Sequence, residues 1–196
     1  AAFGGFVLPF LVDAGYQSAE FDFSLPGVWS ITIDPHKMGR SAIPAGAILY
    51  RDRKTADAAA HQVTYLAGGK TSQRTIVGTR SGASTASVWA VMTHLGKEGY
   101  TAIVKKCMDR TMELADRISK IPGFDIVTEP VMNVIGVRHT DIPVQELVQK
   151  LRNRRWAVSE FPGFFRIVLM PHVTSAMCED FLQILSVVSQ EMSREE

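Results

Sequence analysis

The first part of the chain carries short apolar runs of strand length. Two such runs, at 28–33 and 46–50, flank a polar loop that contains two prolines and a glycine. This pattern predicts a buried strand, a loop of functional character and a second strand. A short helix is expected at 54–60. Residues 64–84 are rich in Gly, Ser and Thr and follow no sustained period, so we expect an irregular segment there.

From residue 81 onward the apolar positions follow a helical period. Ser81 is expected to cap a buried helix that runs to residue 99. A longer amphipathic helix should then extend from 101 until Pro122 and Gly123 stop it. The remaining elements predict a small α+β tail with an antiparallel sheet. They are strands at 125–130 and 133–139, a helix at 143–155, a strand pair within 157–171, and a closing helix at 175–196.

Composition narrows the classes of partner. The 196 residues include 21 basic and 20 acidic side chains, and the net charge is +1. Nucleic acids and anionic lipids select clustered Lys and Arg, so we expect a small ligand and neither of those partners. No apolar run approaches the roughly 18 residues of a membrane span. Cys107 and Cys178 lie in helical patterns and not in a paired spacing, which favours reduced thiols and a cytoplasmic protein.

The opening residues do not read as a targeting segment. They lack a basic leader, and Pro9 interrupts their apolar part. We interpret them as the interior of a domain, and we expect the chain to be part of a longer protein.

Three familiar kinds of site have no support in the sequence. The stretch GGKTS at 68–72 lacks the glycine that a phosphate-binding loop requires, because Thr64 stands in its place. The histidines lie on different predicted elements with no cysteine beside them, so we expect no metal site. A serine nucleophile has no support either, since no G-x-S-x-G elbow occurs.

Two other stretches have suitable chemistry. The sequence VGTRSG at 77–82 places hydroxyls, a guanidinium and flexible backbone before a helix, which suits an anion, although an ordinary helix cap has the same letters. Lys37 follows the first predicted strand, directly after His36. A lysine held there can serve as an amine nucleophile, and a solvated turn lysine is the alternative reading.

Five segments, in this order along the chain, favour the functional interpretation of both stretches over the structural alternatives. AAFGGF, SITIDPHKMG, IPAGAILYRD, TIVGTRSG and FFRIVLMPHV resemble the group II pyridoxal-phosphate-dependent decarboxylases, above all the archaeal tyrosine/aspartate decarboxylases. The resemblance covers essentially the whole chain. It implies the α/β fold of the aspartate aminotransferase-like enzymes (fold type I of the PLP-dependent transferases), with a mainly parallel sheet in the whole protein. Residues 1–98 would end the large cofactor domain, and 99–196 would form the small C-terminal α+β domain.

The resemblance implies roles for particular residues. Lys37 would form the Schiff base with pyridoxal 5'-phosphate (PLP), His36 would lie beside the cofactor phosphate, and Ala2 would pack against the ring. Tyr65 would be the mobile tyrosine that returns a proton after carbon dioxide leaves. Arg166 would hold the substrate carboxylate, with a strand arginine that faces solvent or an acidic neighbour such as Glu160 as an equal alternative.

The resemblance also implies partners and a reaction. Gly78, Thr79 and Arg80 would reach the cofactor phosphate across a homodimer interface. An upstream part of the same protein would supply the aspartate that pairs with the pyridine nitrogen, which keeps the ring an electron sink. The implied function is decarboxylation of an L-amino acid, tyrosine or aspartate first and glutamate third. A carbon–carbon lyase of the sphingosine-phosphate type and a catalytically silent dimerisation fragment are the alternatives.

Overall fold

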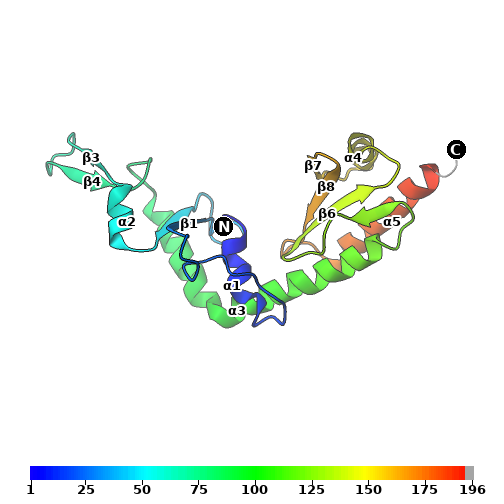
Figure 1. Cartoon of the computed structure of the whole chain (residues 1–196), viewed down its shortest axis with the longest axis horizontal. Helices are drawn as coiled ribbons and strands as arrows, with labels where there is room; N and C mark the ends of the chain where they lie inside the picture. The colour runs from blue at the N-terminus through cyan, green and yellow to red at the C-terminus, as the bar shows by residue number, and fades with distance from the viewer. Residues whose placement is uncertain (193–196) are drawn as a thin grey trace. The chain divides into compact units, whose positions relative to one another are not determined.

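The structure, a computed structural model, describes residues 1–192, which fall into two compact units. The N-terminal unit is Ala1–Tyr100 and the C-terminal unit is Thr101–Glu196. This division lies two residues beyond the domain boundary expected from the sequence. Figure 1 shows the elements of both units in chain order, coloured by residue number.

The N-terminal unit combines short helices with two separate hairpins. Strand β1 pairs with β2 antiparallel, so that Ile31 lies opposite Leu49, and β3 pairs with β4 in the same sense. Every strand pair among the described residues is antiparallel. The elements are the 3-10 helix η1 (Gly4–Phe6), α1 (Leu8–Leu11), β1 (Ser30–Ile33), β2 (Ala47–Tyr50), α2 (Arg53–Ala58), β3 (His61–Val63) and β4 (Thr71–Gln73).

Two expectations for this unit are wrong. The segment 64–84 is not irregular throughout, since Thr71–Gln73 forms β4, which pairs with β3 in a hairpin whose turn includes Gly69 at φ +84°, a conformation that favours glycine. Strands of three residues are too short to show an alternating pattern. Strand β1 is also not buried: only Ile31 is shielded from solvent, because the sheet has just two strands within this chain.

Helix α3 (Gly82–Ile118) occupies the place of the two expected helices. It begins directly after Ser81, where a capping residue was predicted. Gly96 interrupts it with φ 56° and ψ −169°, so the helical hydrogen bonding is broken near the expected junction. Its first part is not buried as expected, since Trp89 and Met92 are exposed.

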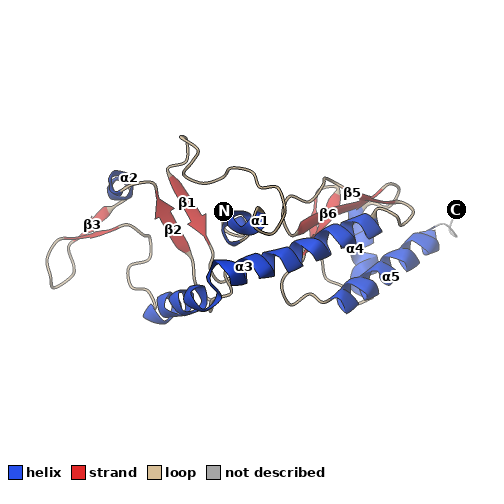
Figure 2. Cartoon of the chain, turned by 90° about the horizontal axis from the view of Figure 1, so that it is seen from below, coloured by secondary structure: helices blue, strands red, loops and turns tan. Residues whose placement is uncertain are grey.

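The C-terminal unit matches the predicted α+β arrangement. Its four-stranded antiparallel sheet has the order β5-β6-β8-β7. The closing helix is described as far as Met192, and residues 193–196 of the expected helix lie outside the described part. Figure 2 shows α4 and α5 with the later part of α3 in this unit. The elements are β5 (Phe124–Ile126), β6 (Val134–His139), α4 (Val144–Asn153), β7 (Ser159–Phe161), β8 (Phe164–Val168) and α5 (Ser175–Met192).

A hydrophobic core fills this second unit. On β6 the alternate residues Ile135 and Val137 are buried, and Val137 lies opposite the buried Phe165 of β8. Helix α4 is strongly amphipathic, because its apolar residues recur at helical spacing and all face the core. The core residues of α4 are Val144, Leu147, Val148 and Leu151.

Candidate active site

Lys37 lies in a tight turn directly after β1. Its backbone N–H donates to the carbonyl of Asp34 at 3.0 Å, which closes a four-residue turn. Its Nζ lies 2.7 Å from Oδ2 of Asp34, so the side chains form an ion pair across the same turn. The Lys37 side chain is 40% exposed and the Asp34 side chain 26%. The amine is therefore held in place and still open to a ligand.

The first residues of the chain pack against this turn. The backbone N–H of Asp34 donates to the carbonyl of Ala2 at 3.1 Å. Gly5 approaches β1 so closely that a Cβ there would lie 2.4 Å from Cγ2 of Ile33. The structure thus brings Ala2 and the Lys37 turn together.

Tyr100 anchors the turn from the end of the N-terminal unit. Its buried hydroxyl donates to the carbonyl of Gly39 at 2.9 Å, and its ring packs against Phe6 and Phe10. Burial raises the pKa of Tyr100, so the phenol keeps the proton that this bond needs. Gly39 has no room for a side chain, because a Cβ would lie 2.6 Å from the carbonyl oxygen of Pro35.

His36 is held through one ring nitrogen. Its Nδ1 lies 2.6 Å from the carbonyl oxygen and 3.2 Å from the amide nitrogen of Ala45. The shorter contact favours a proton on Nδ1 that is donated to the carbonyl. Within residues 1–192 no hydrogen bond engages Nε2, so this nitrogen remains available to a ligand.

Tyr65 and the loop at 78–80 form a second group. Tyr65 is 74% exposed, and its hydroxyl would lie 3.6 Å from a Cβ placed on Gly78. The guanidinium of Arg80 donates to Oγ1 of Thr75 at 2.9 Å, and Thr79 is exposed. The structure brings Tyr65 to Gly78. In the described part of the chain, no hydrogen bond or ion pair joins this group to Lys37 or His36.

Arg166 lies on β8 in the C-terminal unit. Its Nη2 donates to Oγ of Ser159 at 3.3 Å, and its guanidinium carbon stands 5.2 Å from the centre of the Phe161 ring. It faces solvent, as the alternative reading expected, but it makes no ion pair with Glu160. An exposed guanidinium supported by an aromatic ring keeps donors free for a carboxylate.

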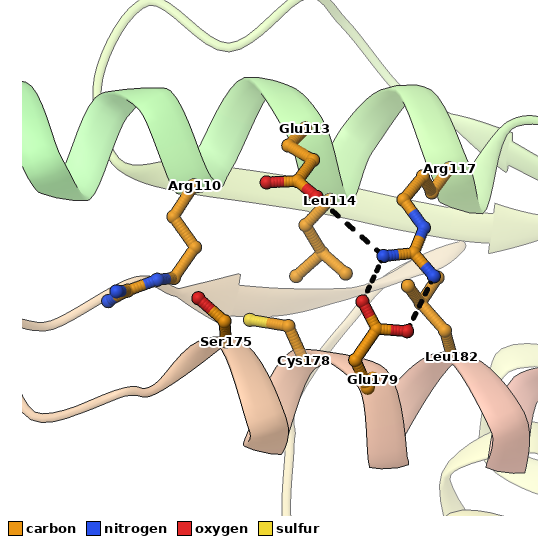
Figure 3. A pocket seen from close by; sticks show the side chains of 8 residues that line it. All are labelled: Arg110, Glu113, Leu114, Arg117, Ser175, Cys178, Glu179 and Leu182. Atoms are coloured by element: carbon orange, nitrogen blue, oxygen red, sulfur yellow. Dashed lines mark hydrogen bonds and ion pairs between the residues drawn. The ribbon is translucent and has the colours of Figure 1, made fainter.

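A pocket in the C-terminal unit lies between α3 and α5 (Figure 3). Its empty volume of about 230 Å³ is below the roughly 300–1,000 Å³ of ligand pockets. Arg117 pairs there with Glu179, and the hydrogen bond from Arg117 lowers the pKa of that carboxyl. Burial raises the pKa of the Cys178 thiol, which keeps it unreactive. These contacts indicate packing between helices.

Other kinds of site are not evident in the described residues. Within 1–192 no three His, Cys, Asp or Glu side chains are grouped so that they could hold a metal ion. The helices of this part of the chain are all too short or too polar to cross a membrane.

Asp34 and Tyr100 are the two residues around Lys37 that the sequence analysis did not single out. An acidic residue three positions before the lysine was a visible signal for a local ion pair. No local signal connects Tyr100 with Gly39, because they lie 61 positions apart in the sequence.

A known protein family matches the part of the chain that contains this turn. The family model described as "Pyridoxal-dependent decarboxylase conserved domain" matches residues 1–139, which include the Lys37 turn and the whole of α3. The chain belongs to this family of pyridoxal-dependent decarboxylases. Membership implies PLP as the cofactor, as the sequence resemblance did.

Individual relatives agree with the family. The chain is 47% identical to a "Probable L-aspartate decarboxylase" of Thermococcus gammatolerans, over 96% of this chain and 49% of that protein. It is 44% identical to a "Probable L-tyrosine/L-aspartate decarboxylase" of Methanothermobacter thermautotrophicus, over 94% and 51%. The chain thus spans about half the length of these curated relatives.

The fold is also shared with a solved structure. The sphingosine-1-phosphate lyase of Burkholderia pseudomallei superposes with a TM-score of 0.85 at 27% identity, over 97% of this chain and 44% of that one. This likeness confirms the predicted fold class of a PLP-dependent enzyme. It extends over both units of the chain.

Proposed function

We propose that the protein containing this chain decarboxylates an L-amino acid with PLP as cofactor. The observation that carries the proposal is the Lys37 turn, in which Lys37 follows His36. There the accessible amine of Lys37 forms an ion pair with the carboxylate of Asp34, and the backbone N–H of Asp34 donates to the carbonyl of Ala2. The names of the relatives support aspartate and tyrosine as the leading substrates. The coarser statement, a pyridoxal-dependent decarboxylase, rests on the family itself.

The residues of the turn fit PLP by their chemistry. An accessible primary amine reacts with an aldehyde, so Lys37 would hold the cofactor covalently as a Schiff base. His36, with Nδ1 engaged by Ala45, would present Nε2 to the cofactor phosphate. Ala2 would pack against the ring. When bound, PLP accepts the electron pair that the departing carboxylate leaves behind.

The protein's own groups would then bind the substrate and return a proton. Arg166 would bind the substrate carboxylate through its free guanidinium donors. A proton would be returned to the carbon that has lost carbon dioxide, from the hydroxyl of Tyr65 or from the amine of Lys37. The exposure of Tyr65 supports the first choice, because a mobile acid needs room to move.

We further propose that the protein is a cytoplasmic homodimer. The loop of Gly78, Thr79 and Arg80 would contact the cofactor phosphate of the other subunit. The adjacent Ile76 and Val77 support this, because an exposed apolar pair is stabilised when a second subunit covers it. Two buried free cysteines suit a reducing compartment.

The domain assignment is part of the same proposal. Residues 1–98 would complete a large cofactor domain, and residues 99–196 would form the small domain. The upstream part of the protein would supply the carboxylate that pairs with the pyridine nitrogen.

A carbon–carbon lyase is the second candidate, favoured by the likeness to the sphingosine-1-phosphate lyase. The two reactions differ in their products. The protein expressed from its complete reading frame should be incubated with PLP and, in turn, L-aspartate, L-tyrosine and L-glutamate. We expect carbon dioxide and one amine in equal amounts. Aldehyde release from a phosphorylated long-chain amino alcohol, with no carbon dioxide from any amino acid, would favour the lyase. Absence of every product would favour a silent domain.

A further inference from the structure

Asp34 makes three of the contacts that hold the Lys37 turn. Its carbonyl accepts the N–H of Lys37, its own N–H donates to Ala2, and its carboxylate pairs with Nζ at 2.7 Å. A carboxylate oxygen at this distance receives a short, charge-assisted hydrogen bond from the ammonium. The ion pair therefore belongs to the state in which the Lys37 amine is free.

Attachment of PLP changes what the nitrogen of Lys37 can donate. When a carbon–nitrogen double bond forms between the aldehyde carbon and Nζ, the aldehyde oxygen leaves as water with two protons of the ammonium. A free ammonium has three N–H donors, whereas the bonded nitrogen keeps at most one. The nitrogen must also turn toward the cofactor. The contact with Asp34 is therefore stronger when Lys37 is free.

We propose that Asp34 is a positioning residue that receives the Lys37 ammonium whenever Lys37 is not bonded to PLP. The inference rests on the proposed role of Lys37. When an amino acid displaces Lys37, the bond to Nζ breaks, the aldehyde carbon bonds the substrate nitrogen, and two protons pass from that nitrogen to Nζ. Asp34 then holds the released ammonium. The contact with Asp34 stabilises both states in which the Lys37 amine is free. In the first state no PLP is bound, and in the second PLP is bonded to the amino acid.

This role predicts the sign of a mutational effect. Asp34→Asn keeps the shape of the side chain and the two backbone hydrogen bonds but removes the charge. Because the free amine loses its partner, PLP should bind about twofold to fivefold more tightly, which corresponds to an exposed ion pair. The amino acid concentration that half-displaces Lys37 should rise by a similar factor. A merely structural role predicts the opposite, because a loosened turn would weaken cofactor binding.

The chain offers a matched control in the same unit. Asp13 pairs with Lys97 at 2.8 Å, and its side chain is 41% exposed. Asp13→Asn removes the same charge from a comparable pair outside the Lys37 turn, so PLP affinity should not change. Asp34→Glu keeps a carboxylate within reach of Lys37 and should restore most of the wild-type affinity.

The test measures the dissociation constant of PLP by absorbance titration on the complete protein. Each sample is then reduced with borohydride, and the phosphopyridoxyl group is located by peptide mass. Tighter binding in Asp34→Asn, with Asp13→Asn unchanged, supports the inference. Equal or weaker binding in a folded Asp34→Asn protein overturns it and leaves the proposed function intact. If Asp34→Asn does not fold, Asp34→Ser removes the same charge and decides by the same criterion. Absence of a Lys37 adduct in the wild type overturns the proposed function and this inference together.

Discussion

The two units of the chain differ in how much apolar surface they bury. In the C-terminal unit, one core joins α3, α4 and α5 to the sheet, and Phe165, Leu147 and Leu185 are fully buried. In the N-terminal unit, Ile76, Trp89 and much of β2 are exposed, and few large side chains are shielded. The residues with candidate cofactor chemistry lie in this less buried unit.

The difference separates the source of folding stability from the candidate cofactor site. Burial of apolar surface is the main source of folding free energy, so the C-terminal unit should dominate the stability of this chain. The Lys37 turn depends on a small number of polar contacts, made by Asp34, Ala45 and Tyr100. Substitution of Lys37 should therefore alter function most, and substitutions in the core of the second unit should alter stability most.

The largest effect is expected at Lys37. Lys37→Ala in the complete protein should abolish the borohydride-trapped adduct and lower decarboxylation at least about 1,000-fold, because the nucleophile is lost. The free energy of unfolding should change by no more than about 1 kcal/mol, the usual contribution of a partly exposed ion pair such as that between Lys37 and Asp34. Activity, adduct mass and urea unfolding test this. Lys37→Arg, which keeps the charge without a nucleophilic amine, should be equally inactive.

The next largest effect is expected in the core of the C-terminal unit. Leu147 is 0% exposed, and Leu147→Ala should lower the free energy of unfolding by about 2–5 kcal/mol through lost burial and a residual cavity. Urea unfolding measures the change. Val131→Ala is the control from the same unit, because Val131 is 72% exposed and should contribute about 0.5 kcal/mol or less. Equal effects of the two variants would contradict the assigned core.

A smaller effect is expected within the N-terminal unit, where one substitution should change both folding stability and PLP binding. Tyr100→Phe removes the hydroxyl that binds the Gly39 carbonyl and leaves that carbonyl without this partner. We expect a loss of about 1–3 kcal/mol in unfolding free energy and weaker PLP binding, because the Lys37 turn is released. Urea unfolding and a PLP titration measure the two changes. If Tyr100→Phe lowers the unfolding free energy but leaves the PLP affinity unchanged, the hydrogen bond from Tyr100 to Gly39 does not position the Lys37 turn.

The smallest effect concerns pH. Burial lowers the pKa of His139 from its ordinary 6.5, although the charge of Asp141 opposes the shift. The neutral ring accepts the backbone N–H groups of Asp141 and Ile142 at Nδ1. Below pH 6.5 the unfolded chain binds more protons than the folded one, so stability should fall as the pH drops from 6.5 through the lowered pKa.

Urea midpoints at pH 7.5 and 5.5 measure this loss. His139→Gln cannot take up the proton and should show a smaller difference between the two pH values. A wild-type midpoint that rises at pH 5.5 would contradict the assignment.

The elements with a strong apolar period could be predicted from the sequence. The helix expected at 143–155 corresponds to α4, and the strand expected at 133–139 corresponds to β6. These residues form elements because they bury a face, so the pattern and the packing have the same cause. The second unit was accordingly predicted more completely than the first.

Features that depend on single contacts were not predicted. The hairpin of β3 and β4 depends on a turn at Gly69, and its strands are too short to show a period. The anchor from Tyr100 to Gly39 joins residues that are far apart in sequence. Lys37 and His36 stood out in the sequence because they follow a predicted strand, and their expected roles came from the resemblance. The pairing of Lys37 with Asp34 required the structure.

The central claim, that Lys37 carries the cofactor, is tested most directly by borohydride reduction of the complete protein loaded with PLP, followed by peptide mass mapping. The account predicts one phosphopyridoxyl group per chain, located on Lys37. A group located on another lysine, or no group at all in a protein that binds PLP, would contradict it.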